Sequence, residues 1–281
     1  MANTEMSEMH NAIGIFDSGY GGLTILDQIR RRLPQYDYLY IGDNARAPYG
    51  PRSYEIVYEF TLQAVNRLFD MGCPLVILAC NTASAKALRT IQQHDLPRMA
   101  DTTRRVLGII RPTVEAIGAI TQSRHVGLVA TQGTIRSHTY ELEIAKTAPD
   151  IVVTAEACPM WVPLVENGEA LTAGADFFVR RHLANLLQRD PLIDAIILGC
   201  THYPLLMDAI RRHTPPTVAI IPQGEYVAAS LEDYLRRHPE MQQRLTQGAT
   251  ATFLTTEQTD NFAPTAQLFL KQPVQAHHIS L

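Results

Sequence analysis

Two of the four cysteines stand where chemistry could use them. Cys80 and Cys200 each follow a short apolar run and precede polar residues that begin a helical pattern. The free N–H groups and the positive end of a helix favour a thiolate over a thiol, so this setting predicts reactive sulfurs. Cys73 and Cys158 each precede a proline and are interpreted as structural. None forms a Cys-x-x-Cys pair, which argues against a structural zinc site and against a secreted disulfide scaffold.

Asp17 and His202 are the candidate partners of these thiols. Asp17 ends the first apolar run, and His202 lies two residues after Cys200. Either side chain could hold or relay a thiol proton. An aspartate before glycine is also a common turn former, and a histidine at a helix start could serve packing alone. The glycines after Asp17 do not follow the G-x-G-x-x-G spacing, so support for a dinucleotide site is poor.

The elements that position these residues alternate along the chain. Apolar runs of strand length occur at residues 13–16, 38–41, 75–79, 106–110, 126–130 and 195–198. Most of them are followed by polar loops and then by helical patterns, including residues 23–33, 83–94 and a stretch from Pro112 to about Ile120. This rhythm predicts an α/β fold with mainly parallel sheets, in which ligands bind at the carboxyl ends of strands.

Two pairs of segments echo each other. Residues 76–82 (VILACNT) resemble residues 196–202 (IILGCTH), and residues 13–19 resemble residues 126–132. A duplicated unit predicts two similar three-layer α/β domains related by a pseudo-twofold axis, with the active site in the cleft between them. The first domain is expected to comprise residues 1–107 plus 222–281 and to carry Asp17 and Cys80. The second, residues 108–221, carries Cys200 and His202.

Composition excludes several classes of protein. The chain has 281 residues, of which 46% are hydrophobic, enough to fill a core. A formal net charge of −4 gives no reason to expect nucleic acid or an anionic membrane as a partner. The apolar runs are too short to span a bilayer. Residues 1–11 have neither a basic n-region nor an apolar h-region, so we expect no secretory signal and a cytoplasmic protein.

Five ordered motifs resemble those of bacterial glutamate racemases, in the aspartate/glutamate racemase superfamily. They are Asp17-Ser18-Gly19-x-Gly21-Gly22, Pro48-Tyr49-Gly50, Cys80-Asn81-Thr82-Ala83-Ser84, Cys158-Pro159 with Val162-Pro163-Leu164-Val165-Glu166, and Gly199-Cys200-Thr201-His202-Tyr203-Pro204. The resemblance extends from about Ile13 to Leu206, and weakly to Leu270. It implies an isomerase that needs no cofactor or metal, interconverts L- and D-glutamate and supplies D-glutamate for peptidoglycan.

Racemisation explains why two thiols would be needed. The α-hydrogen leaves one face of the carbon and a proton returns to the other, so two acid/bases must stand on opposite faces. The resemblance implies that Cys80 deprotonates D-glutamate and Cys200 deprotonates L-glutamate. A free thiol is a few per cent ionised near pH 7, a deficit of about 2 kcal/mol. The carbanion is therefore expected to be the larger barrier, lowered by desolvation and fixed dipoles.

Neutral donors are expected to bind the substrate alongside the four catalytic candidates. The neutral donors are Ser18, Asn81, Thr82, Thr131, Thr134 and Thr201. The resemblance also assigns Pro48, Tyr49 and Gly50 to the distal carboxylate and Glu166 to the neighbourhood of the site. Any single serine or threonine could instead cap a helix, and Glu166 could be a solvated helix residue.

Three segments depart from the family pattern. Tyr20 stands where a small aliphatic residue is usual, residues 98–105 form an insertion, and Pro222-Gln223-Gly224-Glu225 replaces an Asp-Ser-Gly-Glu segment. No predicted catalytic position is lost.

Three other functions stay open at this point. They are a racemase of aspartate or of broad specificity, a non-catalytic binding protein, and a thiol redox protein that cycles a Cys80–Cys200 disulfide. Pro48-Tyr49-Gly50 favours glutamate, and retention of Cys80, Cys200, Asp17 and His202 favours an enzyme. Turnover of glutamate against aspartate, and exchange of the α-hydrogen in heavy water, distinguish the alternatives. A homodimer is one option for the assembly.

Overall fold

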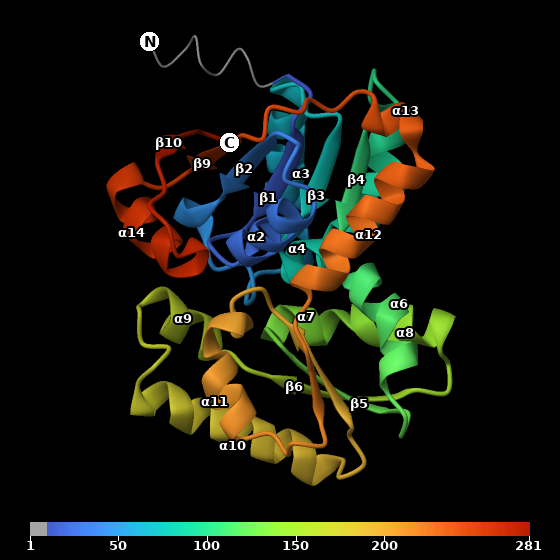
Figure 1. The fold of residues 1–281 in the computed structure, drawn as a ribbon, viewed down its shortest axis with the longest axis vertical. Helices are drawn as coiled ribbons and strands as arrows, with labels where there is room; N and C mark the ends of the chain where they lie inside the picture. The colour runs from blue at the N-terminus through green and yellow to red at the C-terminus, as the bar shows by residue number, and fades with distance from the viewer. Residues whose placement is uncertain (1–9) are drawn as a thin grey trace.

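The structure is a computed structural model that describes residues 10–281. Most of residues 1–11, in which no secretory signal is expected, lies outside this range. Within the described residues, the strands form a six-stranded and a four-stranded sheet, and all neighbouring strands are parallel (Figure 1). The first sheet has the order β10 (Ala276–His278), β9 (Ala251–Thr255), β2 (Tyr38–Gly42), β1 (Ile13–Asp17), β3 (Leu75–Leu78), β4 (Arg105–Gly108). The second has the order β6 (Val152–Ala157), β5 (His125–Ala130), β7 (Ala195–Gly199), β8 (Ala219–Ile221).

Helices cover both faces of each sheet. The main ones are α2 (Gly22–Arg32), α3 (Tyr54–Asp70), α4 (Asn81–Lys86), α6 (Ile110–Ile120), α7 (Gln132–Ser137), α8 (Thr139–Thr147), α9 (Trp161–Glu166), α10 (Ala173–Arg189), α11 (Met207–Arg212), α12 (Gly224–Arg237), α13 (Pro239–Gln242) and α14 (Thr259–Leu270). The expected α/β fold with two parallel sheets is confirmed.

Alternating side chains of each central strand bury opposite faces of its sheet. Ile13 of β1 packs in one cluster with residues of α2 and α12, whereas Phe16 packs with residues of α3. Likewise Val129 of β5 shares a cluster with α10, and Leu128 with α6 and α8. Ile13 and Val129 belong to the same cluster, so one apolar core continues through both halves of the molecule.

Four strands of each half follow the same order. The order β2-β1-β3-β4 in the first sheet corresponds to β6-β5-β7-β8 in the second. The echoed segments therefore occupy equivalent positions, because residues 13–19 and 126–132 cover β1 and most of β5, and residues 76–82 and 196–202 begin within β3 and β7 and continue past their ends. Strands β9 and β10 extend the first sheet beyond β2. The residues at which the chain divides into domains stay a prediction.

Two expected elements differ from the structure. The strand expected over residues 106–110 ends at Gly108, and α6 begins at Ile110. A short apolar run does not by itself distinguish a strand from the start of a buried helix. The helix expected over residues 83–94 begins earlier, at Asn81, and is interrupted at Ala87, beyond which α5 (Leu88–Thr90) and a π-helical turn continue it. No glycine or proline marks that interruption.

No helix in residues 10–281 has both the length and the hydropathy needed to cross a membrane.

The two halves approach each other closely at Gly21, the residue before α2. A Cβ atom at Gly21 would lie 2.2 Å from Thr201 Oγ1 and 2.4 Å from His202 Nδ1. The backbone there is right-handed helical (φ −59°, ψ −35°), so glycine is required by proximity and not by its dihedral angles. Thr24 Oγ1 donates to the Thr201 carbonyl at 2.9 Å and ties α2 to the same loop.

We predict that Gly21→Ala lowers the free energy of unfolding by about 1–3 kcal/mol, because the new methyl group overpacks the contact with Thr201 and His202. Gly118→Ala is the matched control: it lies inside α6, its Cβ would have 3.8 Å to the nearest atom, and helix propensity should make it neutral or stabilising. Urea unfolding measures both. Equal stability of the two variants would contradict the close approach.

Candidate active site

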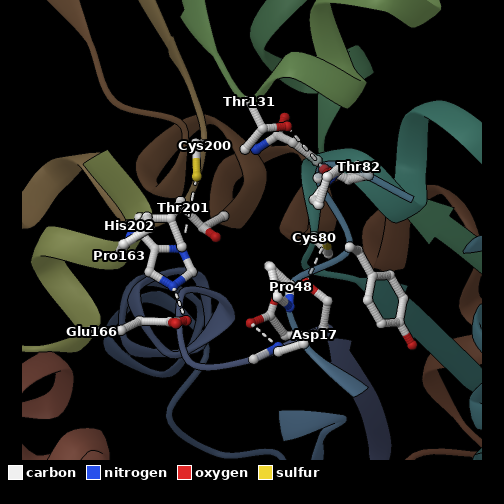
Figure 2. Close-up of a pocket in the computed structure, with 18 of the residues that line it drawn as sticks. Asp17, Pro48, Cys80, Thr82, Thr131, Pro163, Glu166, Cys200, Thr201 and His202 are labelled. Atoms are coloured by element: carbon white, nitrogen blue, oxygen red, sulfur yellow. Dashed lines mark hydrogen bonds and ion pairs between the residues drawn. The ribbon is translucent and has the colours of Figure 1, made fainter. Parts of the chain in front are cut away.

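A cavity of about 170 Å³ lies between the carboxyl edges of the two sheets. Residues that follow β1, β2 and β3 line it from the first half, and residues that follow β5, β6 and β7 line it from the second. Figure 2 shows Cys200 with His202 and Glu166 on one side and Cys80 with Asp17 on the other. A cavity of this volume holds several water molecules and suits a ligand the size of an amino acid.

Most of the predicted site residues meet at this cavity. Those that line it are Asp17, Ser18, Pro48, Tyr49, Gly50, Cys80, Asn81, Thr82, Thr131, Glu166, Cys200, Thr201 and His202. Thr134 does not line it. Its side chain is buried behind the wall, where it bonds to Thr131 Oγ1 at 3.1 Å and to Thr82 Oγ1 at 3.4 Å. This threonine cluster joins α4 of the first half to α7 of the second.

Cys80 is held at the start of α4 by hydrogen bonds to its sulfur. The Ala83 N–H donates to Cys80 Sγ at 3.4 Å, and Ser18 Oγ lies 3.2 Å from it. Asp17 is buried beside this pair, and its carboxylate accepts the Gly19 N–H at 3.1 Å. Burial raises the pKa of Asp17, although the nearby His202 and the N–H groups of Gly22 and Gly19 oppose the rise.

The start of a helix is expected to favour the thiolate of Cys80, and the Ala83 N–H does lower the pKa of the thiol, but burial has the larger and opposite effect. Burial raises the pKa of the Cys80 thiol to about 12, and the neighbouring Asp17 carboxyl adds to the rise. The hydrogen bonds from Ser18 and Ala83 lower the pKa, but by less. Desolvation of the charged sulfur therefore outweighs the favourable end of α4. Burial thus favours the protonated thiol of Cys80.

Cys200 is connected through His202 to the carboxylate of Glu166. Cys200 Sγ lies 3.7 Å from His202 Nδ1, and His202 Nε2 lies 2.8 Å from Glu166 Oε1. Burial alone lowers the pKa of His202, but its bonds to Cys200 and Glu166 outweigh that and raise it to about 10. A protonated His202 donates to Glu166 and toward the sulfur at once. Glu166, predicted to be near the site, thus orients the histidine that serves Cys200.

The segment Pro48-Tyr49-Gly50 enters the cavity wall from the loop after β2. The Tyr49 hydroxyl donates to Asp43 Oδ2 at 2.5 Å, and Arg46 Nε donates to the same oxygen at 2.7 Å. The guanidinium of Arg46 in turn lies 4.0 Å from the ring centroid of Phe60. Because the Tyr49 hydroxyl is committed to Asp43, this segment offers a ligand its backbone and its ring.

Several residues at the cavity were not predicted as site residues. They are Gly19, Ala47, Pro51, Gln132, Pro159, Val162 and Pro163. The motif around Pro159 and Val162-Pro163 was the signal that could have found three of them, since it precedes Glu166 in sequence. Behind the wall, Tyr140 and Gln223 bond to Asn81 from 59 and 142 positions away, where the local pattern carries no signal.

The remaining cysteines lie outside the cavity. Cys73 and Cys158 are buried and unpaired with other sulfurs, and burial raises the pKa of both, that of Cys73 to about 12. Among residues 10–281, no three His, Cys, Asp or Glu side chains gather as a metal site would require.

Comparison with known proteins gives a consistent result. Residues 23–231 match the model of the Asp/Glu/hydantoin racemase family. The chain is 44% identical over 274 residues to a glutamate racemase of Dinoroseobacter shibae, covering 94% of this chain and 97% of that one. A solved glutamate racemase of Bacillus anthracis superposes with a TM-score of 0.87 at 34% identity, covering 98% and 99% of the two chains. A Francisella tularensis glutamate racemase solved with D-glutamate gives 0.85 at 30%, covering 96% and 98%.

We predict that His202 makes stability depend on pH. Its pKa is 6.5 in the unfolded chain and about 10 in the folded one, so the folded protein binds the extra proton between these values. The free energy of unfolding should therefore fall as pH rises above 6.5, by up to about 1.4 kcal/mol per pH unit. Urea unfolding between pH 6.5 and 8 measures this, below the ordinary pKa of cysteine and tyrosine.

His202→Gln should flatten this dependence, and Glu166→Gln should weaken it. His138→Gln is the control, because that histidine side chain is 70% exposed and far from the thiols in sequence. A His202→Gln variant that keeps the full pH slope would show that the histidine is not held protonated.

Proposed function

Because the chain belongs to the Asp/Glu/hydantoin racemase family, we propose that it interconverts L-glutamate and D-glutamate, with Cys80 and Cys200 as two opposed acid/bases. The observation that carries the proposal is that the two thiols follow equivalent strands of two sheets, β3 and β7, and line one cavity of amino-acid size. The glutamate racemases that this chain resembles over nearly its full length support the choice of substrate.

The reaction moves one proton at each sulfur. A thiolate takes the α-hydrogen as a proton, the electron pair stays on the carbon beside the carboxylate, and the opposite thiol returns a proton to the other face. From D-glutamate, Cys80 is the base and Cys200 the acid; from L-glutamate the roles reverse. One sulfur must therefore be ionised and the other protonated when the substrate binds.

The surroundings of the two sulfurs divide these roles. At the pKa of about 12 given by burial, the thiolate of Cys80 is about 7 kcal/mol less stable than the thiol at pH 7. This is well above the deficit of about 2 kcal/mol expected for a free thiol. Cys80 therefore begins as the acid. His202, with its proton held by Glu166, donates toward Cys200 Sγ and stabilises negative charge there.

The same division suggests how Cys80 becomes a base. Opposite unit charges 4 Å apart attract by about 4 kcal/mol at an effective dielectric constant of 20. The α-ammonium group of a bound amino acid is a cation that the substrate itself brings into this buried space. We propose that it offsets part of the cost of the Cys80 thiolate, and that Asp17 and Ser18 receive or hold the thiol proton.

Neutral donors would bind the two carboxylates. Ser18, Asn81, Thr82, Thr131 and Thr201 supply hydroxyl and amide groups at the cavity wall. The segment Pro48-Tyr49-Gly50 is proposed to meet the distal carboxylate through its backbone, and Thr134 to orient Thr131 and Thr82. Among the described residues, neither lysine nor arginine lines the cavity, so these neutral donors would bind the substrate carboxylates without a lysine or arginine partner.

The proposal includes the protein's role and location in the cell. We propose that the product supplies peptidoglycan synthesis and that the protein works in the cytoplasm, in keeping with its four unpaired cysteines. From the family resemblance we also propose a homodimer as its assembly.

We predict that Cys80→Ser and Cys200→Ser each reduce racemisation of glutamate by roughly 10²–10⁴-fold, the usual contribution of a general acid/base. In heavy water each variant should still exchange the α-hydrogen of one enantiomer without inverting it. Cys80→Ser should exchange L-glutamate, and Cys200→Ser should exchange D-glutamate. Chiral chromatography and proton NMR measure both reactions.

Cys73→Ala is the control, because it removes a buried thiol that lies outside the cavity, and it should leave turnover unchanged. Mild and equal losses in the two serine variants, or exchange of both enantiomers by either one, would contradict the two-thiol scheme. Wild-type protein that neither racemises glutamate nor exchanges its α-hydrogen would contradict the proposed function as a whole.

A further inference from the structure

Three buried side chains form a closed ring of hydrogen bonds behind the cavity. Asn81 Nδ2 donates to Gln223 Oε1 at 2.5 Å, Gln223 Nε2 donates to the Tyr140 hydroxyl at 2.7 Å, and that hydroxyl donates to Asn81 Oδ1 at 2.7 Å. All three side chains are almost completely buried. Asn81 alone of the three lines the cavity, directly after Cys80.

A backbone carbonyl fixes the direction of this ring. Gln223 Nε2 also donates to the Ile109 carbonyl at 3.2 Å. A carbonyl oxygen accepts hydrogen bonds and never donates, so the amide nitrogen of Gln223 must face Ile109 and its oxygen must face Asn81. Asn81 must then turn its nitrogen to Gln223 and its oxygen to Tyr140. The orientation of the Asn81 amide therefore follows from Ile109, 28 residues away in sequence.

The ring also stands where the chain crosses between the two sheets. Ile109 lies in the first crossing, between β4 and α6, and Gln223 lies in the second, between β8 and α12. One glutamine side chain thus joins both crossings, while Asn81 belongs to α4 of the first half and Tyr140 to α8 of the second. The sequence departure at residues 222–225 contains this glutamine.

We propose that Gln223 is a positioning residue that fixes the Asn81 amide for the amino-acid substrate, an inference that rests on the proposed function. The ring uses one Nδ2 hydrogen and one Oδ1 lone pair of Asn81. The second hydrogen is available to a substrate carboxylate, and its direction is set before the substrate arrives. Such preorganisation stabilises the bound state because no rotation of the amide has to be restricted on binding. Tyr140 completes the ring and acts through Asn81 in the same way.

Tyr140→Phe and Gln223→Met test this by removing one ring member each while keeping similar volume. The KM for both enantiomers should rise roughly tenfold, the effect of about 1.4 kcal/mol of lost orientation, while kcat changes by less than about threefold. Tyr38→Phe is the matched control. It deletes an equally buried tyrosine hydroxyl, which donates to the Leu33 carbonyl at 2.6 Å outside the cavity, and should leave KM unchanged.

A second measurement needs no turnover. In wild-type protein labelled with ¹⁵N-asparagine, the side-chain NH₂ of Asn81 should exchange with solvent far more slowly than that of Asn167, which is exposed. Tyr140→Phe should accelerate the exchange and Tyr38→Phe should not. Fast exchange in the wild type, or an unchanged KM in both folded ring variants, would overturn the proposal. If the wild type failed to racemise glutamate, the proposed function would be wrong. The exchange measurement would still test whether the ring holds the Asn81 amide.

Discussion

A proton can leave one face of a tetrahedral carbon and return to the other face only if acid/bases stand on both sides of it. A single parallel sheet presents its loops along one edge, so it supplies groups from one direction. Two sheets whose carboxyl edges face each other supply them from both. Here the equivalent strands β3 and β7 end next to Cys80 and Cys200, and the close packing at Gly21 and Thr201 keeps the gap small. The continuous apolar core and the hydrogen bonds of the threonine cluster also hold the two halves together.

The two sulfurs are equally buried at equivalent positions, but different side chains surround them. Cys80 has a buried carboxyl beside it, and Cys200 has a histidine whose proton is held by Glu166. The same low-dielectric space that raises the pKa of Cys80 also strengthens attraction to a substrate cation. Asymmetry between two equivalent strand ends is therefore a consequence of which side chains pack around the cysteines. It provides one acid and one base without any change in backbone architecture.

The sequence was sufficient to predict what local patterns determine. Strand-length apolar runs predicted the sheets, and the repeated setting of Cys80 and Cys200 predicted that they meet. Two kinds of feature were out of reach. The ionisation of Cys80 depends on how deeply it is buried, which its neighbours in sequence do not determine. Contacts such as Gln223 with Asn81 join segments 142 positions apart, and only the folded chain brings them together.

The arrangement of two sulfurs about one carbon can be observed directly in a crystal structure of the wild-type protein with D-glutamate. The account predicts that Cys80 Sγ and Cys200 Sγ both lie in van der Waals contact with the α-carbon, on opposite faces of it, with the α-hydrogen directed at Cys80. A structure in which both sulfurs lie on the same face, or in which either is separated from the α-carbon by another side chain, would contradict it.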